Sequence, residues 1–129
     1  MVARMTDDDK LAVAARFAAA SRDNDAAAYR ALCAPDATTW HNFDELDVDT
    51  ERTLRTVAWL HRSVADLAWH DVALSPTPTG FVAQTMMTGT APGGPLRVLS
   101  CVIVTLDDDG LVRRVEEYLD TAQTAPLRG

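Results

Sequence analysis

Residues 96–120 read LRVLSCVIVTLDDDGLVRRVEEYLD, and this stretch decides the fold. Two runs rich in Val, Leu and other strand-forming residues, 96–106 and 111–120, flank an Asp-Asp-Asp-Gly turn, a pattern typical of a β-hairpin. Residues 98–104 are apolar at almost every position, which predicts a strand covered on both faces. We expect one face to meet helices of the same chain and the other to meet a second subunit.

Two more extended stretches precede this hairpin, at residues 67–74 and 81–90. Pro, Thr and Gly residues separate the two stretches, and a Pro-Gly-Gly turn separates the second one from residue 96. Consecutive long strands joined by short turns form an antiparallel meander. The second half of the chain is therefore predicted to contain four antiparallel strands.

The start of the chain is predicted to form two helices. Thr6 followed by Asp9 is a capping-box pattern, so a helix begins at the next residue after Thr6. A second helix is capped by Asp23 or Asp25. It is stopped by Pro35, because a proline pushes the residue before it out of the helical conformation.

A strand and a third helix follow. Residues 37–43 include Thr38, Thr39 and Trp40, which suit a strand, and an acidic loop follows at 44–49. Thr50 is expected to cap the third helix. One stripe of this helix, at three- and four-residue spacing, is expected to face the core. It consists of Leu54, Val57, Ala58, His61 and Val64.

The composition indicates a single globular domain over residues 1–129. The chain has 47% hydrophobic and 24% charged residues and a net charge of -7. Negative charge repels phosphate groups and anionic lipids, so neither nucleic acid nor a membrane is expected as a partner. The acidic start lacks a signal-peptide pattern, which predicts a cytoplasmic location. The two cysteines, Cys33 and Cys101, lie far apart and have no metal-ligand spacing.

The order helix, helix, strand, helix and four antiparallel strands resembles the nuclear transport factor two superfamily, also called SnoaL-like or ketosteroid isomerase-like. Residues 34–38 (APDAT), 40–42 (WHN), 80–82 (GFV) and 115–120 (VEEYLD) carry the resemblance, which covers nearly the whole chain. It implies an α+β barrel in which a cone-shaped, curved antiparallel sheet packs against three N-terminal helices. Such proteins have an apolar pocket and are commonly dimeric through the outer sheet face.

Members of this superfamily include isomerases, polyketide cyclases, dehydratases and epoxide hydrolases, and also proteins that only bind partners. The resemblance to ketosteroid isomerases implies that His41 stands where those enzymes have their general-base aspartate. Phe17 stands where they have an oxyanion-hole tyrosine, so that donor is missing here. Limonene epoxide hydrolases have a tyrosine and an asparagine on the first strand, which Trp40 and Asn42 resemble, and a carboxylate with a counterpart in Glu117.

The chemistry of His41 and Glu117 favours a catalytic pair. An imidazole has an ordinary pKa of about 6.5, so it can accept a proton and return it within one turnover. Glu117 lies between apolar neighbours on the last strand, where partial desolvation raises the pKa of a carboxyl group. The structural alternatives are a histidine bonded to the loop at 44–49 and an ion pair between Glu117 and Arg97.

Neighbouring residues of a strand point to opposite faces, so the pattern leaves open whether His41 or the set Trp40 and Asn42 lines the pocket. Large apolar side chains are expected to supply the ligand-binding surface, with a histidine on the inward stripe of the third helix as a second titratable group. The predicted ligand-binding residues are Trp40, Phe17, His61, Met86 and Trp59.

The sequence therefore predicts a small-molecule enzyme of isomerase, cyclase, dehydratase or hydrolase type that uses acid–base chemistry on a hydrophobic ligand. His41 would move the proton, Glu117 would be its acid or orienting partner, and Asn42 would bond the developing oxyanion. No phosphate loop or metal-ligand spacing is present in the sequence, so no cofactor and no metal are expected. The alternative is a non-catalytic module that binds a lipophilic ligand or dimerises. A homodimer is expected for the enzyme.

Overall fold

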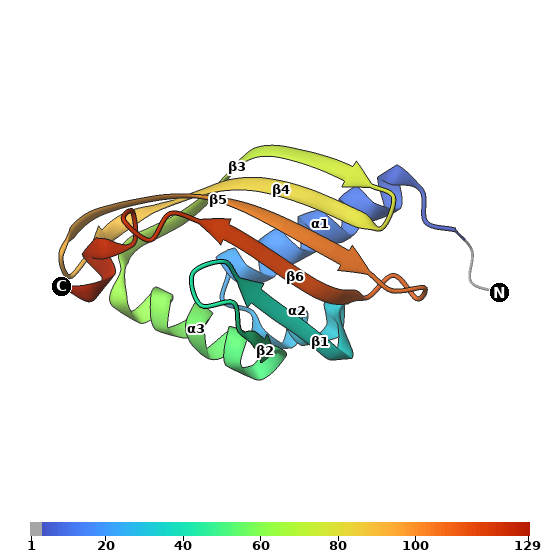
Figure 1. Ribbon diagram of the computed structural model, residues 1–129, viewed down its shortest axis with the longest axis horizontal. Helices are drawn as coiled ribbons and strands as arrows, with labels where there is room; N and C mark the ends of the chain where they lie inside the picture. The colour runs from blue at the N-terminus through green and yellow to red at the C-terminus, as the bar shows by residue number, and fades with distance from the viewer. Residues whose placement is uncertain (1–3) are drawn as a thin grey trace.

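Three helices lie against one face of a curved six-stranded sheet in the computed structural model, which describes residues 4–129 (Figure 1). The helices are α1 (Asp7–Arg22), α2 (Ala26–Leu32) and α3 (Thr50–Ser63), followed near the end of the chain by the short 3-10 helix η1 (Ala125–Arg128). The predicted α+β class and cone-like arrangement are confirmed, but the sheet does not close into a barrel.

The strands are β1 (Cys33–His41), β2 (Asp47–Asp49), β3 (Ala65–Thr77), β4 (Gly80–Ala91), β5 (Gly94–Leu106) and β6 (Val112–Leu119). Their order in the sheet is β2-β1-β6-β5-β4-β3, so β2 and β3 form its two edges. Strands β3 to β6 form the predicted antiparallel meander. Strand β1 lies parallel to β6, so the sheet is mixed and not antiparallel throughout.

The helices begin where side chains satisfy the free backbone N–H groups. The Asp9 N–H donates to Thr6 Oγ1 at 3.1 Å and the Thr6 N–H donates to Asp9 Oδ2 at 2.9 Å, which confirms the predicted capping box. Asp25 caps α2. Helix α3 is capped by Asp49, and the predicted cap Thr50 is instead its first residue.

Strand β1 begins at Cys33 and ends at His41, whereas the sequence places the strand at residues 37–43. Pro35 therefore lies inside the strand and does not merely end a helix. The paired residues of β1 and β6 jump from Cys33 to Thr38, so the missing N–H of the proline removes no ladder bond. The short edge strand β2 is unexpected, because acidic residues have low strand propensity.

Two clusters of buried apolar side chains lie between the sheet and the helices. The first joins α1 to β4, β5 and β6 and consists of Val13, Ala14, Phe81, Val102, Val104, Val112 and Val115. The second lies at the C-terminal end of α3 and consists of Val64, Ala91, Leu96 and Val98. Phe81 is fully buried, and burial of such a side chain contributes roughly 1.5–3 kcal/mol.

The outer face of the sheet is not covered within the described chain (Figure 1). Leu99 of β5 and Tyr118 of β6 are 41% and 43% exposed on this face. Residues 98–104 are thus covered on the helix side, and no helix of residues 4–129 lies over their outer side (Figure 1).

Strand β3 forms a long, irregular edge. Its register with β4 shifts between Asp71 and Ala73, and Val72 lies at this bulge with 62% of its surface exposed. Pro76 lies near the end of the strand, where its pairing partner is Phe81. The edge is therefore neither straight nor continuously able to donate hydrogen bonds.

Candidate active site

A histidine and a glutamate form a close pair on neighbouring parallel strands. His41 is the last residue of β1, and Glu117 stands directly opposite on β6. His41 Nε2 lies 2.8 Å from Glu117 Oε1. The side chains are 23% and 27% exposed, so both are largely shielded and still reached by solvent. Both residues were predicted from the sequence, and the structure brings them together.

The pair points to the helix side of the sheet. Thr39, two residues before His41, is buried, and its partner Val115 belongs to the first cluster. Because side chains alternate along a strand, His41 and Glu117 share the face of these two residues. Of the two sets that the sequence left open, His41 is the one on the helix side of the sheet.

The surroundings raise the pKa of His41. Partial burial disfavours the charged imidazolium and lowers the pKa, but the hydrogen bond to Glu117 and the negative charges of Glu117 and Asp44 outweigh that effect. The imidazole is therefore a stronger base than a free histidine side chain.

Phe43 lies at the solvent side of the imidazole. Its ring centroid is 5.0 Å from that of His41, and the residue is 52% exposed. An exposed aromatic ring in this position offers an apolar contact to a molecule that reaches His41. The sequence pattern places Phe43 only within a strand, because nothing in the alternation of residues shows that the chain turns here.

Tyr29 of α2 is a second residue that the sequence pattern did not identify. It is 3% exposed, and its ring centroid lies 5.4 Å from that of Phe17. Burial, nearby Cys33 and the charge of Glu117 raise the pKa of Tyr29 far above its usual value, and the bond with Thr39 only partly opposes them. The hydroxyl therefore stays neutral. A buried tyrosine hydroxyl needs a hydrogen-bond partner. This requirement is the one sequence signal that could have identified Tyr29.

Asn42 lies beside the pair, but its amide is already engaged. Its Nδ2 donates to Leu119 O at 3.1 Å, and its Oδ1 accepts from Leu119 N at 3.0 Å. The Asn42 backbone N–H donates to Glu117 O at 3.1 Å. These bonds continue the pairing of β1 with β6, so in this arrangement the amide fixes strand ends and is not free to bond an oxyanion.

Phe17 and His61 lie between the helices and the sheet, and their role in ligand binding stays a prediction. Phe17 packs on the first cluster, with its ring centroid 6.0 Å from that of Phe81. His61 Nε2 lies 3.0 Å from Ser21 O, and its ring centroid is 5.4 Å from that of Trp69. His61 thus ties α3 to the end of α1 and packs on the sheet.

Trp40 lies on the opposite face of β1 from His41. Its ring centroid is 5.3 Å from that of Tyr118, which is exposed on the outer face. The expectation that Trp40 lines the same pocket as His41 is corrected by this placement. Adjacent residues of an unbulged strand end cannot both face the helices.

Met86 and Trp59 also lie away from the pair. Met86 points to the outer face, because its neighbour Met87 packs on the second cluster on the helix side. Trp59 is 41% exposed on α3, where it lines a depression with Arg52, Arg55 and Thr56. The predicted placement of Met86 and Trp59 around the ligand is therefore corrected as well.

No protein-family model matches the sequence, and no curated protein matches it. Solved structures do match the fold. PrhC from Penicillium brasilianum is 17% identical with a TM-score of 0.84, over 95% of this chain and 87% of that one. A protein from Jannaschia sp. CCS1 named as a SnoaL-like polyketide cyclase is 17% identical with a TM-score of 0.79, over 100% and 99%. An LEH-like epoxide hydrolase from M. tuberculosis is 14% identical with a TM-score of 0.73, over 95% and 92%.

This chain has the SnoaL-like fold. The three structures extend over 95% or more of this chain, so its helices and strands are matched as one unit. At 14% and 17% identity the likeness shows the fold alone. One fold supports many reactions, so the function has to be argued from the side chains of this chain.

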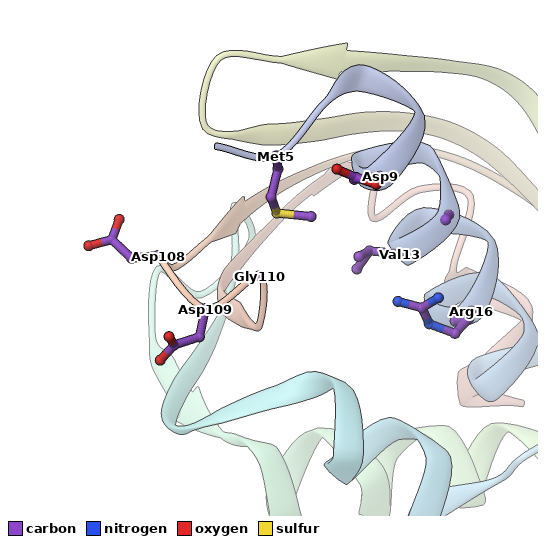
Figure 2. A pocket seen from close by; sticks show the side chains of 8 residues that line it. Met5, Asp9, Val13, Arg16, Asp108, Asp109 and Gly110 are labelled. Atoms are coloured by element: carbon purple, nitrogen blue, oxygen red, sulfur yellow. The ribbon is translucent and has the colours of Figure 1, made fainter. Parts of the chain in front are cut away.

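Two surface depressions of this chain lie away from the pair. The depression of about 300 Å³ on α3 includes Trp59. The other, of about 320 Å³, lies between the start of α1 and the turn from β5 to β6, with Met5, Arg16 and Gly110 among its lining residues (Figure 2). Neither is lined by His41 or Glu117, so neither is the cavity expected around them.

Three observations concern other kinds of site in this chain. Within residues 4–129, no three His, Cys, Asp or Glu side chains gather as metal ligands would. Over the same range, every helix is too short or too polar to cross a bilayer. Cys33 and Cys101 are both free thiols and partly exposed.

Proposed function

We propose that this protein is an enzyme that transfers protons on a small, largely apolar molecule, with His41 as the base and Glu117 as its orienting carboxylate. The observation that carries the proposal is the 2.8 Å contact between His41 Nε2 and Glu117 Oε1 on the helix side of the sheet. A half-shielded imidazole with a raised pKa beside a carboxylate is an arrangement suited to acid–base catalysis.

Each nitrogen of the imidazole has its own role in the proposed reaction. The Nε2–H group donates to Glu117, which leaves the lone pair of Nδ1 to take a proton from the substrate. Glu117 stabilises the imidazolium until the proton is returned to a different atom of the same molecule. A positioned group of this kind typically accelerates proton transfer by about 10²–10⁴-fold.

The proposed substrate is an apolar molecule with a carbonyl group. Loss of a proton from the carbon next to a carbonyl is a step shared by isomerisation, ring closure and elimination of water. The half-exposed ring of Phe43, whose centroid lies 5.0 Å from that of His41, favours an apolar ligand. The neutral Tyr29 hydroxyl lies near Glu117 and can contribute a dipole where negative charge develops. A hydrolase would use the same base to activate water.

Exchange of an acidic C–H proton tests the proposal. The wild-type protein should accelerate loss of deuterium from α-deuterated 2-tetralone in water, followed by NMR. His41→Ala should slow this exchange by about 10²-fold or more while the affinity for the ketone changes little. His70→Ala is the matched control, because His70 is exposed on the outer face and its ring bonds Thr88.

Two results would count against the proposal. Equal exchange rates for wild type and His41→Ala would remove His41 from the mechanism. An equal loss in His70→Ala would show that the effect is not specific to the pair.

A non-catalytic module that binds a lipophilic ligand is the second candidate function. The observation that favours it is the state of Asn42, whose amide is held by Leu119 at both ends. Phe17, which has no hydroxyl, supplies no donor either. Binding of 2-tetralone without any acceleration of exchange by the wild type would support this module over the enzyme.

We also propose that the outer sheet face pairs with a second copy of the chain. Exposed apolar side chains lie on this face, and no helix of residues 4–129 covers it (Figure 1). Leu99 and Tyr118 are the most exposed of these side chains, and Trp40 packs against Tyr118. Burial of such a patch against itself removes apolar surface from water. The active site faces the other side of the sheet, so pairing leaves it open.

A further inference from the structure

Helix α3 presents a row of basic and aromatic side chains away from the sheet (Figure 1). Residues three or four positions apart lie along one side of a helix. Four exposed residues of α3 have this spacing and form what we call the arginine row: Arg52, Arg55, Trp59 and Arg62. The other side of α3 carries the partly buried stripe that faces the core, so the arginine row points outward.

The guanidinium groups of the arginine row have no ion-pair partner within residues 4–129. Glu51 is the only acidic residue of α3, and Arg30 of α2 already holds it. Arg30 Nε and Nη2 each donate to a Glu51 carboxylate oxygen at 2.8 Å. The row therefore keeps its positive charge, although the chain as a whole has a net charge of -7.

The depression on α3 lies along part of the arginine row. Its volume is about 300 Å³, and its lining residues, none of them acidic among those described, are Arg52, Arg55, Thr56 and Trp59. The depression at the start of α1 is different, because Arg16 shares its lining with the three aspartates Asp9, Asp108 and Asp109 (Figure 2). Of the two depressions, only the one on α3 has positive charge without negative charge beside it.

The length of the arginine row favours an extended acidic segment of a protein. Residues 52–62 extend over roughly 15 Å at a rise of about 1.5 Å per residue, and an extended peptide covers that length in about five residues. Carboxylates of the segment can pair with the guanidinium forks. An apolar side chain between them can lie on the Trp59 ring, which is 41% exposed.

Thr56 distinguishes a peptide from a simple anion. Its Oγ1 donates to Arg52 O at 3.3 Å, so towards a ligand this hydroxyl can only accept. A backbone N–H of a peptide meets that requirement, and the oxygens of a phosphate do not. The Arg52 N–H, at the start of the helix, is already bonded to Asp49 Oδ1 at 2.8 Å. A phosphate would therefore find separated arginines and no free N–H group of Arg52.

We propose that the arginine row docks an acidic, extended segment of a partner protein, with carboxylates on its arginines and an apolar side chain on Trp59. Arginine clusters recognise acidic motifs in this way. A bilayer is disfavoured because Trp59 is the one apolar member of the row. The negative charge of the rest of the chain repels an acidic segment and directs it to α3.

The proposed docking is independent of the other proposals. The arginine row points away from the sheet, and the outer sheet face lies on the opposite side of the molecule (Figure 1). A dimer through the outer face therefore leaves the row free. Neither His41 nor Glu117 belongs to the row, so its function does not depend on the proposed reaction.

NMR titration with a short capped peptide tests the proposal. The probe is acetyl-Glu-Glu-Leu-Glu-Glu-amide, and its control has glutamine in place of every glutamate. The backbone amides of α3 and the indole N–H of Trp59 should shift with the acidic peptide only. Arg52→Gln and Arg55→Gln should each weaken binding by about two- to fivefold. Arg16→Gln is the matched control, because it removes the same charge from the other depression and should bind as wild type does.

A second peptide tests the contact with Trp59. Replacing the central leucine of the probe with alanine should weaken its binding to wild type more than its binding to Trp59→Ala, since the variant lacks the ring on which the leucine lies. Equal weakening in the two proteins would contradict this contact. In about 1 M NaCl, where charges are screened beyond about 3 Å, the shifts of α3 should largely disappear.

The remaining outcomes decide between kinds of partner. No shift in α3, equal shifts with the glutamine peptide, or equal weakening by Arg16→Gln would overturn the proposal. Vesicles of phosphatidylserine and phosphatidylcholine, and inorganic pyrophosphate, are titrated in parallel. Binding of either that depends on Arg55 and is tighter than binding of the peptide would replace the protein partner with a bilayer or a phosphate compound. Unchanged amide signals of the sheet show that each variant is folded.

Discussion

His41 and Glu117 couple proton binding to the stability of the fold. The pKa of His41 in the folded protein is raised above its usual value. The folded state therefore holds the proton more tightly than the unfolded chain, whose histidine has a pKa of about 6.5. The stabilisation is fully present below about pH 6.5 and is lost as the pH rises through the folded pKa.

Glu117→Gln should remove most of this effect. The glutamine keeps the size of the side chain and lacks its charge, so the pKa of His41 should fall, as followed by NMR titration of the imidazole. Between about pH 6 and about pH 8, the free energy of unfolding should decrease in wild type and change less in the variant. The pH midpoint of deuterium exchange should move down with the pKa. An unchanged midpoint would mean that Glu117 does not control the imidazole.

At the residue scale, the sequence selected the titratable residues but not their geometry. His41 was selected because an imidazole titrates near neutrality, and Glu117 because it lies between apolar neighbours on the last strand. Their contact depends on β1 lying parallel to β6 in one register, which alternation within a single strand does not reveal. Trp40 was misplaced for the same reason. Tyr29 was missed because its burial depends on the packing of α2.

Strand β4 starts so close to β5 that its first residue has no room for a side chain. A Cβ on Gly80 would lie 2.0 Å from Val104 O and 3.0 Å from Val104 C. Both atoms are backbone atoms, so they cannot move without disturbing the ladder. This glycine therefore sets how closely the two central strands of the meander approach each other.

Gly80→Ala should lower the free energy of unfolding by roughly 1–3 kcal/mol, because the strands have to separate to accept the methyl group. Urea denaturation measures the change. Gln84→Ala on the same strand, at an exposed position, should stay within about 0.5 kcal/mol of wild type. A Gly80→Ala protein with the wild-type midpoint would show that the close approach contributes nothing to stability.

At the element scale, the regular elements followed from the sequence and the irregular ones did not. The capping box at Thr6 and the four strands of the meander were predicted correctly in kind. The early start of β1 was not, because Pro35 reads as a helix stop and the shifted register that accommodates it involves a distant strand. The acidic strand β2 forms because it pairs with β1, a tertiary contact that overrides propensity.

The two faces of the sheet carry different kinds of side chain. The helix side holds the His41–Glu117 pair, and the outer side presents apolar side chains in a chain with a net charge of -7. Such charge keeps molecules apart in general, so a specific dimer needs apolar contact to overcome it.

Leu99→Glu should disrupt the proposed dimer. A buried, unpaired carboxylate at the centre of the interface is costly, so sedimentation should show a dimer for wild type and a monomer for the variant at the same micromolar concentration. Trp59→Glu, which changes an exposed apolar residue on α3, is the control and should remain dimeric. A monomeric wild type would contradict the proposed pairing.

The bulge at Val72 affects the tendency of the protein to aggregate. Strand β3 is 13 residues long and lies at an edge, and a straight edge of this length is a template for the growth of cross-β fibrils. The kink at Val72 and the absent donor at Pro76 interrupt that template. A chain that lacked Val72 would lose the kink and keep only the missing donor at Pro76 to interrupt the edge, so its storage lifetime in concentrated solution would shorten.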